Sequence, residues 1–193
     1  MKLSLKKIKK IYKKEKQGFV FLISGIFLLL IYSGWRFYQL RILSFWGKDN
    51  LVNKESQERK GSLPVYIKSY PIGIDIEIKE AEIVKGVWQV YPTSVSHLNS
   101  SGRIGEEKNI VIYGHNKDDV FGPIRYMKEG SEIELSDENG KKYIYKVVKT
   151  DIVKPDNLDY VLPKNEEILT LYTCVGFFDS ERFIVVAKRD FNL

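Results

Sequence analysis

Hydrophobic and polar positions divide the chain into two parts with different patterns. Residues 18–35 form an apolar run without a charged side chain, whereas after about residue 72 apolar residues tend to alternate with polar ones. A long unbroken apolar run is typical of a membrane-spanning helix, and strict alternation is typical of β-strands with one buried face. The pattern therefore predicts one N-terminal apolar helix followed by a domain built mainly of strands.

The alternation is clearest in residues 72–78, where four isoleucines at every second position are separated by small or acidic residues. Only residues 93–98 and 121–127 are expected to form short helical turns. Because strands this short and numerous leave no helices long enough for βαβ crossovers, a mainly antiparallel closed barrel or sandwich is expected. Turn-forming residues separate the further expected strands, at 87–91, 109–113, 131–135, 142–153, 168–173 and 182–187.

The apolar run is predicted to be a transmembrane signal anchor over residues 18–38. About 20 helical residues suffice to cross the hydrocarbon core of a bilayer, and Trp35, Tyr38 and Trp46 suit its far interface. A cleaved signal peptide fits less well, since the first alanine of the chain is Ala81 and no Ala-x-Ala cleavage site follows the run. A buried core helix also fits less well, because the run is apolar on all sides and follows a block of lysines.

Charge is concentrated before the apolar run. Residues 1–17 contain eight lysines and one glutamate; subtracting this +7 from the total net charge of +6 leaves −1 for the rest of the chain. The basicity thus belongs to the tail, and a nucleic-acid-binding surface is not expected on the folded part. Lysines directly before a membrane span predict that residues 1–17 are cytoplasmic and that the remainder lies outside the cell.

Two further segments complete the expected organisation. Residues 39–62 are predicted to be a stalk, because residues 47–62 are polar, charged and poor in aromatic side chains. Residues 63–193 are predicted to be one extracellular domain. A single cysteine excludes an intramolecular disulfide framework.

The one cysteine lies at the end of an expected strand and is a candidate nucleophile. Cys174 ends the expected strand 168–173, Arg182 begins the next strand, and a seven-residue loop joins them. If the two strands pair as a hairpin, Cys174 and Arg182 share one end of the sheet. His115 also directly follows an expected strand, and a thiol needs a nearby cation or imidazole to become a nucleophile.

Alternatives remain open for each of these residues. Cys174 could be a buried apolar side chain, and Arg182 could instead form a surface salt bridge with Asp179 or Glu181. His115 could be a structural residue, as a histidine taken alone more often is. The other histidine, His97, lies in a polar turn segment and is expected to be structural.

These residues resemble the sortase family. Residues 170–174, TLYTC, match the sortase signature of Thr, Leu, any residue, Thr, Cys; VIYGHN resembles the strand end with the sortase histidine, and ERFIVVAKR the strand that opens with its arginine. The resemblance covers residues 63–193. It implies an eight-stranded sortase-like β-barrel in which Cys174 is the nucleophile, His115 the general acid or base, and Arg182 the donor to substrate and oxyanion, while Thr173 helps shape the substrate site.

The resemblance also implies a function and a location. Sortases are membrane-anchored cysteine transpeptidases of the bacterial surface that cleave an LPXTG-like sorting signal and transfer the protein to a cell-wall precursor amine or a pilin lysine. A class D or class E-like enzyme is expected, with specificity depending largely on the loop 154–167.

No cofactor or metal is expected. Calcium bound by surface carboxylates is a weaker alternative to a solvated surface, with candidates Glu106, Glu107, Asp118 and Asp119. A catalytically silent, membrane-tethered β-domain that binds wall components is the alternative function.

Overall fold

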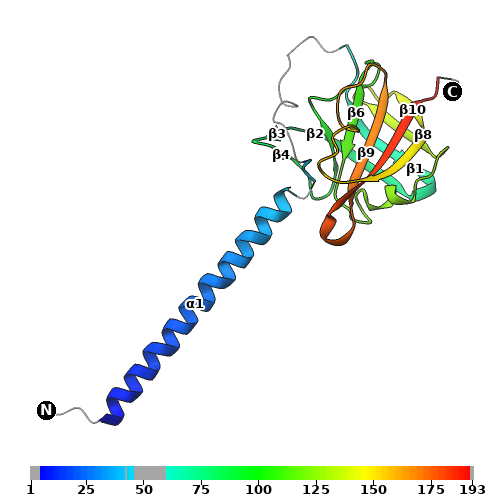
Figure 1. Ribbon diagram of the computed structural model, residues 1–193. Helices are drawn as coiled ribbons and strands as arrows, with labels where there is room; N and C mark the ends of the chain where they lie inside the picture. The colour runs from blue at the N-terminus through cyan, green and yellow to red at the C-terminus, as the bar shows by residue number, and fades with distance from the viewer. Residues whose placement is uncertain (1–4, 42, 46–59, 192–193) are drawn as a thin grey trace. The chain divides into compact units, whose positions relative to one another are not determined.

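The computed structural model describes residues 5–41, 43–45 and 60–191 and divides into two compact units, with the division between Leu40 and Arg41 (Figure 1). Each unit is described by itself. Trp46 and most of the expected stalk, residues 46–59, lie outside the described residues.

The first unit contains a single long helix, α1 (Leu5–Arg41), up to Leu40. Its segment Gly18–Tyr38 is 21 residues long and apolar enough to cross a membrane, which matches the predicted anchor. At about 1.5 Å rise per residue, this segment is roughly as long as a hydrocarbon core is thick. Large apolar side chains such as Phe21, Leu29 and Tyr32 are exposed along it.

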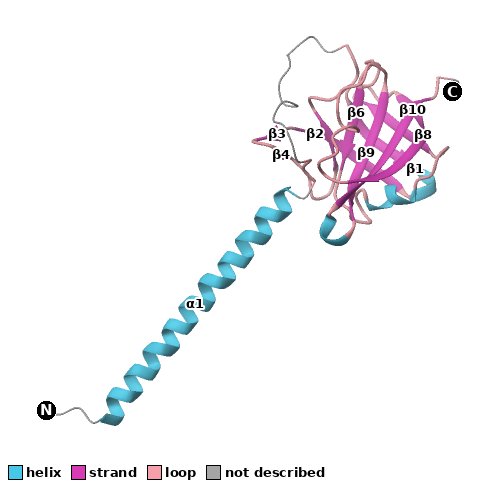
Figure 2. Ribbon diagram, viewed as in Figure 1, coloured by secondary structure: helices cyan, strands magenta, loops and turns pink. Residues whose placement is uncertain are grey.

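The second unit contains a closed eight-stranded β-barrel, as predicted (Figure 2). Its strands follow the order β1-β2-β5-β6-β9-β10-β8-β7 around the barrel. Most neighbours are antiparallel, but β2–β5 and β6–β9 are parallel pairs. The barrel strands are β1 Pro64–Ser69, β2 Ile74–Ala81, β5 Val95–Leu98, β6 Asn109–Tyr113, β7 Glu132–Asp137, β8 Lys142–Val153, β9 Ile168–Val175 and β10 Glu181–Arg189.

Several short elements are present besides the barrel strands. Strands β3 (Ile83–Val84) and β4 (Val87–Trp88) form a separate two-stranded sheet. Three 3₁₀ turns are described, and the predicted turn around residues 121–127 is one of them: η2 Tyr70–Ile72, η3 Gly122–Tyr126 and η4 Phe177–Asp179.

The short helical turn predicted for residues 93–98 is wrong. Val95–Leu98 form β5, which pairs with β2 on one side and with β6 on the other. All four residues are buried. A strand with both faces covered need not alternate apolar and polar residues, so the polar Ser96 and His97 concealed it.

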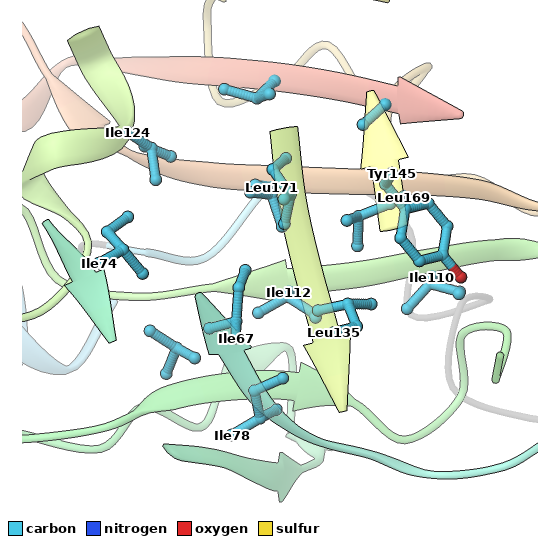
Figure 3. Close-up of a cluster of buried hydrophobic side chains, with 14 of the residues drawn as sticks. Ile67, Ile74, Ile78, Ile110, Ile112, Ile124, Leu135, Tyr145, Leu169 and Leu171 are labelled. Carbon is cyan, nitrogen blue, oxygen red and sulfur yellow. The ribbon is translucent and has the colours of Figure 1, made fainter. Parts of the chain in front are cut away.

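The barrel interior is filled by alternate residues of its strands. Ile110 and Ile112 of β6 and Leu169 and Leu171 of β9 belong to one apolar cluster, together with Ile67 of β1 (Figure 3). Because successive side chains of a strand point to opposite faces, the intervening residues of β6, β9 and β10 face the outside of the barrel.

On the outside, these intervening residues form a second buried cluster instead of a solvated surface. It includes Val111 and Tyr113 of β6, Tyr172 and Cys174 of β9, and Ile184 of β10. An outer face that is apolar and buried must be covered by other segments, and this is where the candidate site lies.

Candidate active site

Cys174 lies near the end of β9, on the outer face of the barrel. The predicted hairpin is confirmed, since β9 and β10 pair with Cys174 directly opposite Arg182. Side chains opposite one another in an antiparallel pair have Cβ atoms about 4.5–5.5 Å apart. Cys174 is only 2% exposed and packs in the outer apolar cluster.

Arg182 is a buried cation held by main-chain carbonyls. Its side chain is 2% exposed. Nη1 donates to the carbonyl oxygens of Asp179 and Glu181, both at 3.0 Å, and Nη2 donates to the carbonyl oxygen of Ser44 at 3.0 Å. The loop residues considered as carboxylate partners of Arg182 thus contact it through their backbone, which fixes the guanidinium beside Cys174.

His115 reaches the same end of the barrel through the parallel pair β6–β9. In this pair Tyr113 lies opposite Tyr172, and the Gly114 N–H continues the ladder by donating to the Tyr172 carbonyl at 3.3 Å. His115 follows Tyr113 by two positions, as Cys174 follows Tyr172. The histidine and the cysteine therefore leave two neighbouring strands at the same level.

Thr173 lies on the opposite face of β9 from Cys174. It is fully buried, and its hydroxyl donates to the carbonyl oxygen of Gly114 at 2.8 Å. This bond ties the end of β9 to the residue that precedes His115. The expected influence of Thr173 on the site would therefore be exerted through the placement of His115.

The turn after His115 is tightly closed. The His115 carbonyl accepts from the N–H groups of Lys117 and Phe121 at 2.8 and 3.1 Å, and Gly122 N–H donates to the Lys117 carbonyl at 2.8 Å. A Cβ on Gly122 would lie 2.7 Å from that carbonyl oxygen. Only glycine fits this approach, so Gly122 helps to define where the imidazole is held.

The environment favours the neutral forms of both titrating groups. Burial raises the pKa of Cys174 to about 12, with Arg182 acting in the opposite direction. Burial and, to a lesser degree, Lys117 lower the pKa of His115, against the effect of Asp179. A raised thiol pKa and a lowered imidazole pKa leave thiol and neutral imidazole as the main species at pH 7.

Asp179 is a charged member of the site that the sequence reasoning treated only as a possible salt-bridge partner. It lies in the loop between β9 and β10 with a left-handed backbone, φ 56°. Its carboxylate acts electrostatically on Cys174, on His115 and on Arg182, and burial raises its own pKa. Its place between Cys174 and Arg182 in the sequence indicates that it lies near the site. The left-handed backbone that orients its carboxylate has no signal in the sequence.

Three aromatic rings belong to the same outer cluster as Cys174. Tyr113 and Tyr172 stack with ring centroids 5.1 Å apart and an interplanar angle of 8°. Trp88 of β4 meets both rings edge-on, at 5.3 and 5.9 Å. Sequence reasoning did not single out these three rings, because they lie in three separate strands.

The loop 154–167, on which specificity was expected to depend, packs against the same face. Leu158, Tyr160 and Val161 contact the outer cluster. The buried Asn109 amide donates to the carbonyl oxygens of Tyr160 and Leu162 at 2.8 and 3.2 Å. Asn109 thus fastens this loop to β6.

Three residues of the expected stalk also cover this face. Leu43, Ser44 and Phe45 are 1%, 3% and 5% exposed and belong to the same unit as the barrel. Leu43 and Phe45 are members of the cluster that contains Cys174.

His97 is fully buried in β5, with Nε2 at 2.9 Å from the Gly102 carbonyl oxygen, as expected of a structural residue.

In the described residues, no group of three or more His, Cys, Asp or Glu side chains could hold a metal ion. Of the calcium candidates, Asp118 pairs with Arg125 at 3.1 Å and Glu106 accepts from the Arg103 N–H at 3.1 Å.

Comparisons with known proteins agree with this geometry. The family model "Sortase domain" matches residues 71–190. A Bacillus subtilis (strain 168) protein named "Putative sortase YwpE" is 35% identical over 83 residues, which are 42% of this chain and 80% of that protein.

Solved structures share the fold. Sortase C from Clostridium perfringens SM101 matches with a TM-score of 0.55 at 24% identity, over 67% of this chain and 71% of that one. A Clostridium perfringens sortase D5 transpeptidase matches with a TM-score of 0.58 at 24% identity, over 69% and 82%. Listeria monocytogenes sortase A matches with a TM-score of 0.55 at 19% identity, over 67% and 88%.

Proposed function

Because the chain belongs to the sortase family, we propose that it is a membrane-anchored cysteine transpeptidase that cleaves an LPXTG-like sorting signal of secreted proteins. The observation that carries this proposal is the opposed pair Cys174 and Arg182 in β9 and β10, with His115 at the same level of the neighbouring strand. A nucleophile, a proton carrier and a fixed cation are the three groups that acyl transfer requires.

The first half of the reaction forms a thioester. His115 accepts the proton of the Cys174 thiol, and the thiolate attacks the scissile carbonyl carbon. The negative charge moves to the carbonyl oxygen, where the Arg182 guanidinium, which stays charged at any working pH, can stabilise it. When the tetrahedral intermediate collapses, the C–N bond breaks and His115 returns its proton to the leaving amine.

The second half transfers the acyl group. The acceptor amine attacks the thioester carbon, and the deprotonated His115 takes a proton from it. Collapse of the second tetrahedral intermediate breaks the C–S bond, and the proton returns to the sulfur. Arg182 stabilises the same oxygen in both halves, so one cation lowers the activation barrier of both steps.

The reactive ion pair is a minor species of the resting site. With the Cys174 pKa raised to about 12 and the His115 pKa lowered, transfer of the proton from thiol to imidazole is uphill at pH 7. The Arg182 cation favours the thiolate and the Asp179 carboxylate favours the imidazolium. Arg182 therefore lowers the cost of forming the pair, whereas Asp179 favours the imidazolium and disfavours the thiolate.

The acceptor is proposed to be a cell-wall precursor amine or a pilin lysine. The apolar segment Gly18–Tyr38 supports a single-pass anchor in the bacterial cell membrane. Lysines in residues 1–17 support a cytoplasmic N-terminus, which leaves the catalytic domain outside the cell. A class D or class E-like enzyme stays a prediction.

One observation favours a second candidate, a silent domain that binds wall components or peptides without cleaving them. Cys174 is 2% exposed, and a thiol with a pKa raised to about 12 is unreactive at neutral pH. The silent domain predicts that Cys174 resists alkylation even when a sorting-type peptide is bound. The enzyme predicts that the peptide itself becomes attached to the sulfur.

The test is a transpeptidation assay with the full chain in detergent. Peptides varied around the LPXTG pattern are incubated with a small amine nucleophile, and products are identified by mass spectrometry beside the Cys174→Ala variant. Cleavage after the Thr with amine incorporation, absent in the variant, is the expected result. Absence of cleavage and of an acyl-enzyme with every peptide would overturn the proposal.

A further inference from the structure

Asn109, the first residue of β6, is a buried polar side chain that joins three segments of the chain. It is 2% exposed. Its Nδ2 donates to the carbonyl oxygens of Tyr160 and Leu162 at 2.8 and 3.2 Å, and its Oδ1 accepts from the Thr170 hydroxyl of β9 at 2.8 Å. Thr170 is 1% exposed. One amide group therefore ties the loop 154–167 to β6 and β9 together.

The chemistry of this contact requires an amide at position 109. A side-chain amide has two N–H donors and one carbonyl acceptor, and all three groups are engaged here. The two loop carbonyl oxygens can only accept, so the amide nitrogen faces the loop and the Thr170 hydroxyl donates to the amide oxygen. A carboxylate at this position would place an acceptor against the loop carbonyls, which is strongly unfavourable for buried groups.

Asn109 and Thr170 lie on the same face of the barrel as Cys174. Alternate residues of a strand share a face, so Thr170 and Cys174, four positions apart in β9, both point outward. Four residues of a strand span about 13 Å. Over this distance the Asn109–Thr170 pair does not touch the reacting atoms, but it lies beside the surface on which an extended peptide would approach Cys174.

The loop residues held by Asn109 contribute apolar side chains to this surface. Val161 is 4% exposed and belongs to the outer cluster that contains Cys174, and Leu158 packs against that cluster. The N–H groups of Val161 and Leu162 both donate to the Leu158 carbonyl oxygen, at 2.9 and 3.1 Å. Residues 158–162 therefore form a compact turn, and Asn109 binds the backbone of that turn.

The other contacts of this loop are weaker or lie further along the chain. The Tyr160 hydroxyl donates to the Asp151 carboxylate and accepts from Lys149 Nζ, but this group is partly exposed, and exposed charged pairs contribute little. Glu167 accepts from the Tyr145 hydroxyl at 2.6 Å, beyond the turn and next to β9. The buried amide of Asn109 is thus the contact that fixes the turn 158–162.

We propose that Asn109 and Thr170 are positioning residues that hold the turn 158–162 as one wall of the peptide-binding surface and thereby determine how tightly and how selectively a peptide binds beside Cys174. The consequence for turnover rests on the proposed function, whereas the restraint of the turn does not. Because the pair does not touch the reacting atoms, its loss raises KM and weakens selectivity while kcat stays nearly constant.

Four variants separate the hydrogen bonds from other effects. Asn109→Asp replaces the two donors by an acceptor. Thr170→Val removes the hydroxyl at nearly constant shape, and Thr170→Ser restores a hydroxyl at the same position. Asn99→Asp is the matched control, since the exposed Asn99 amide donates to the Glu82 carboxylate at 3.1 Å and lies outside the loop.

Hydrogen exchange of the full chain in detergent measures the restraint of the turn without a peptide. The Val161 and Leu162 amides are expected to exchange about tenfold faster or more in Asn109→Asp and about threefold faster in Thr170→Val. Thr170→Ser and Asn99→Asp should match the wild type. Unchanged exchange in β10 shows in the same spectra that the barrel is intact.

Peptide kinetics then test the effect on recognition. In Asn109→Asp, KM for the preferred peptide is expected to rise about tenfold while kcat stays within about threefold. The preference for this peptide over peptides altered away from the scissile bond should fall, and Thr170→Ser should restore what Thr170→Val loses. A loss of folded protein would instead lower kcat at constant KM, so the two causes are distinguished.

Unchanged exchange of the turn in Asn109→Asp would overturn the proposal, and so would faster exchange with unchanged KM and selectivity. Should Asn109→Asp not fold, the comparison of Thr170→Val with Thr170→Ser decides in the same way. If the wild type binds labelled peptides without cleaving them, fluorescence anisotropy replaces kinetics. Binding about tenfold weaker in Asn109→Asp would then support the positioning pair and count only against the transpeptidase, whereas a wild type that binds no peptide would overturn both.

Discussion

Cys174 and Arg182 occupy directly opposed positions in the antiparallel pair β9–β10. This relationship is built into the strands, because each residue is fixed by the register that also pairs Phe183 with Thr173 and Ile184 with Tyr172. The loop between the strands then adds two carbonyl acceptors for the guanidinium, from Asp179 and Glu181. The cation is therefore positioned by backbone geometry, with its Nη2 donor on the Ser44 carbonyl oxygen.

Arg182→Lys is expected to lower kcat/KM for peptide cleavage by roughly 100-fold or more. Lysine keeps the charge but carries all its donors on one nitrogen, so it cannot reproduce the Nη1 contacts to Asp179 and Glu181 together with the Nη2 contact to Ser44. Steady-state kinetics with the preferred peptide measure the loss. Arg103→Lys, in a partly exposed ion pair with Glu80 at 3.1 Å, is the control and should stay within about twofold; an equal loss in both variants would contradict the role of Arg182.

The alkylation rate of Cys174 is expected to rise about tenfold per pH unit from pH 7 to pH 10, because its pKa is raised to about 12 and the thiolate is the reacting species. The sign follows from burial, which disfavours the charged form. Free cysteine, with a pKa of about 8.5, is the reference and should level off in this range. A plateau of the protein rate anywhere between pH 7 and pH 10 would show that the thiol pKa is not raised to about 12.

Asp179→Asn is expected to lower the pKa of His115 further and to lower the pKa of Cys174. The Asp179 carboxylate stabilises the imidazolium and destabilises the thiolate, so its removal moves both values downward. NMR titration of the His115 imidazole resonances follows the first change, with buried His97 as the other signal, and alkylation at pH 8 follows the second.

Glu181→Gln is the matched control for this prediction. Glu181 lies in the same loop and also accepts from Arg182 through its carbonyl oxygen. Loss of its carboxylate should leave the His115 titration nearly unchanged. A His115 pKa that rises in Asp179→Asn, or that falls equally in both variants, would contradict the electrostatic role of Asp179.

Gly122→Ala is expected to lower kcat/KM by about tenfold or more, because its Cβ would lie 2.7 Å from the Lys117 carbonyl oxygen and would force open the turn behind His115. Peptide kinetics and thermal unfolding are measured together. Gly130→Ala is the control: its φ of +83° makes alanine strained, but nothing lies within 4 Å of its Cβ. Equal loss of activity per degree of lost Tm in both variants would argue against a specific effect on His115.

Much of the fold follows from the period-two pattern in the sequence. The strands β6, β8, β9 and β10 coincide closely with runs of β-branched and aromatic residues, and the adjacency of β9 and β10 correctly predicted the hairpin with Cys174 and Arg182. The apolar helix over Gly18–Tyr38 also follows from the sequence, because its length and lack of charge are visible there.

Other features depend on contacts between distant segments and have no local signal. β5 is buried on both sides, so its polar residues do not alternate with apolar ones and wrongly predict a turn. The sequence places residues 43–45 in the expected stalk, since no pattern in three residues shows that they pack on Trp88, Tyr172 and Arg182. The role of Asp179 depends on a left-handed backbone that non-glycine residues adopt only when the surrounding structure holds them.

The central claim, that Cys174 is the acylated nucleophile, is tested most directly by trapping the acyl-enzyme. The full chain is incubated with the preferred sorting peptide without an added amine, quenched in acid, and analysed by intact-mass and peptide mass spectrometry. The account predicts that the mass increases by the acyl fragment up to the Thr, located on Cys174 and removed by hydroxylamine, and that Cys174→Ala shows none. Peptide cleavage that persists in Cys174→Ala, or an adduct on another residue, would contradict it.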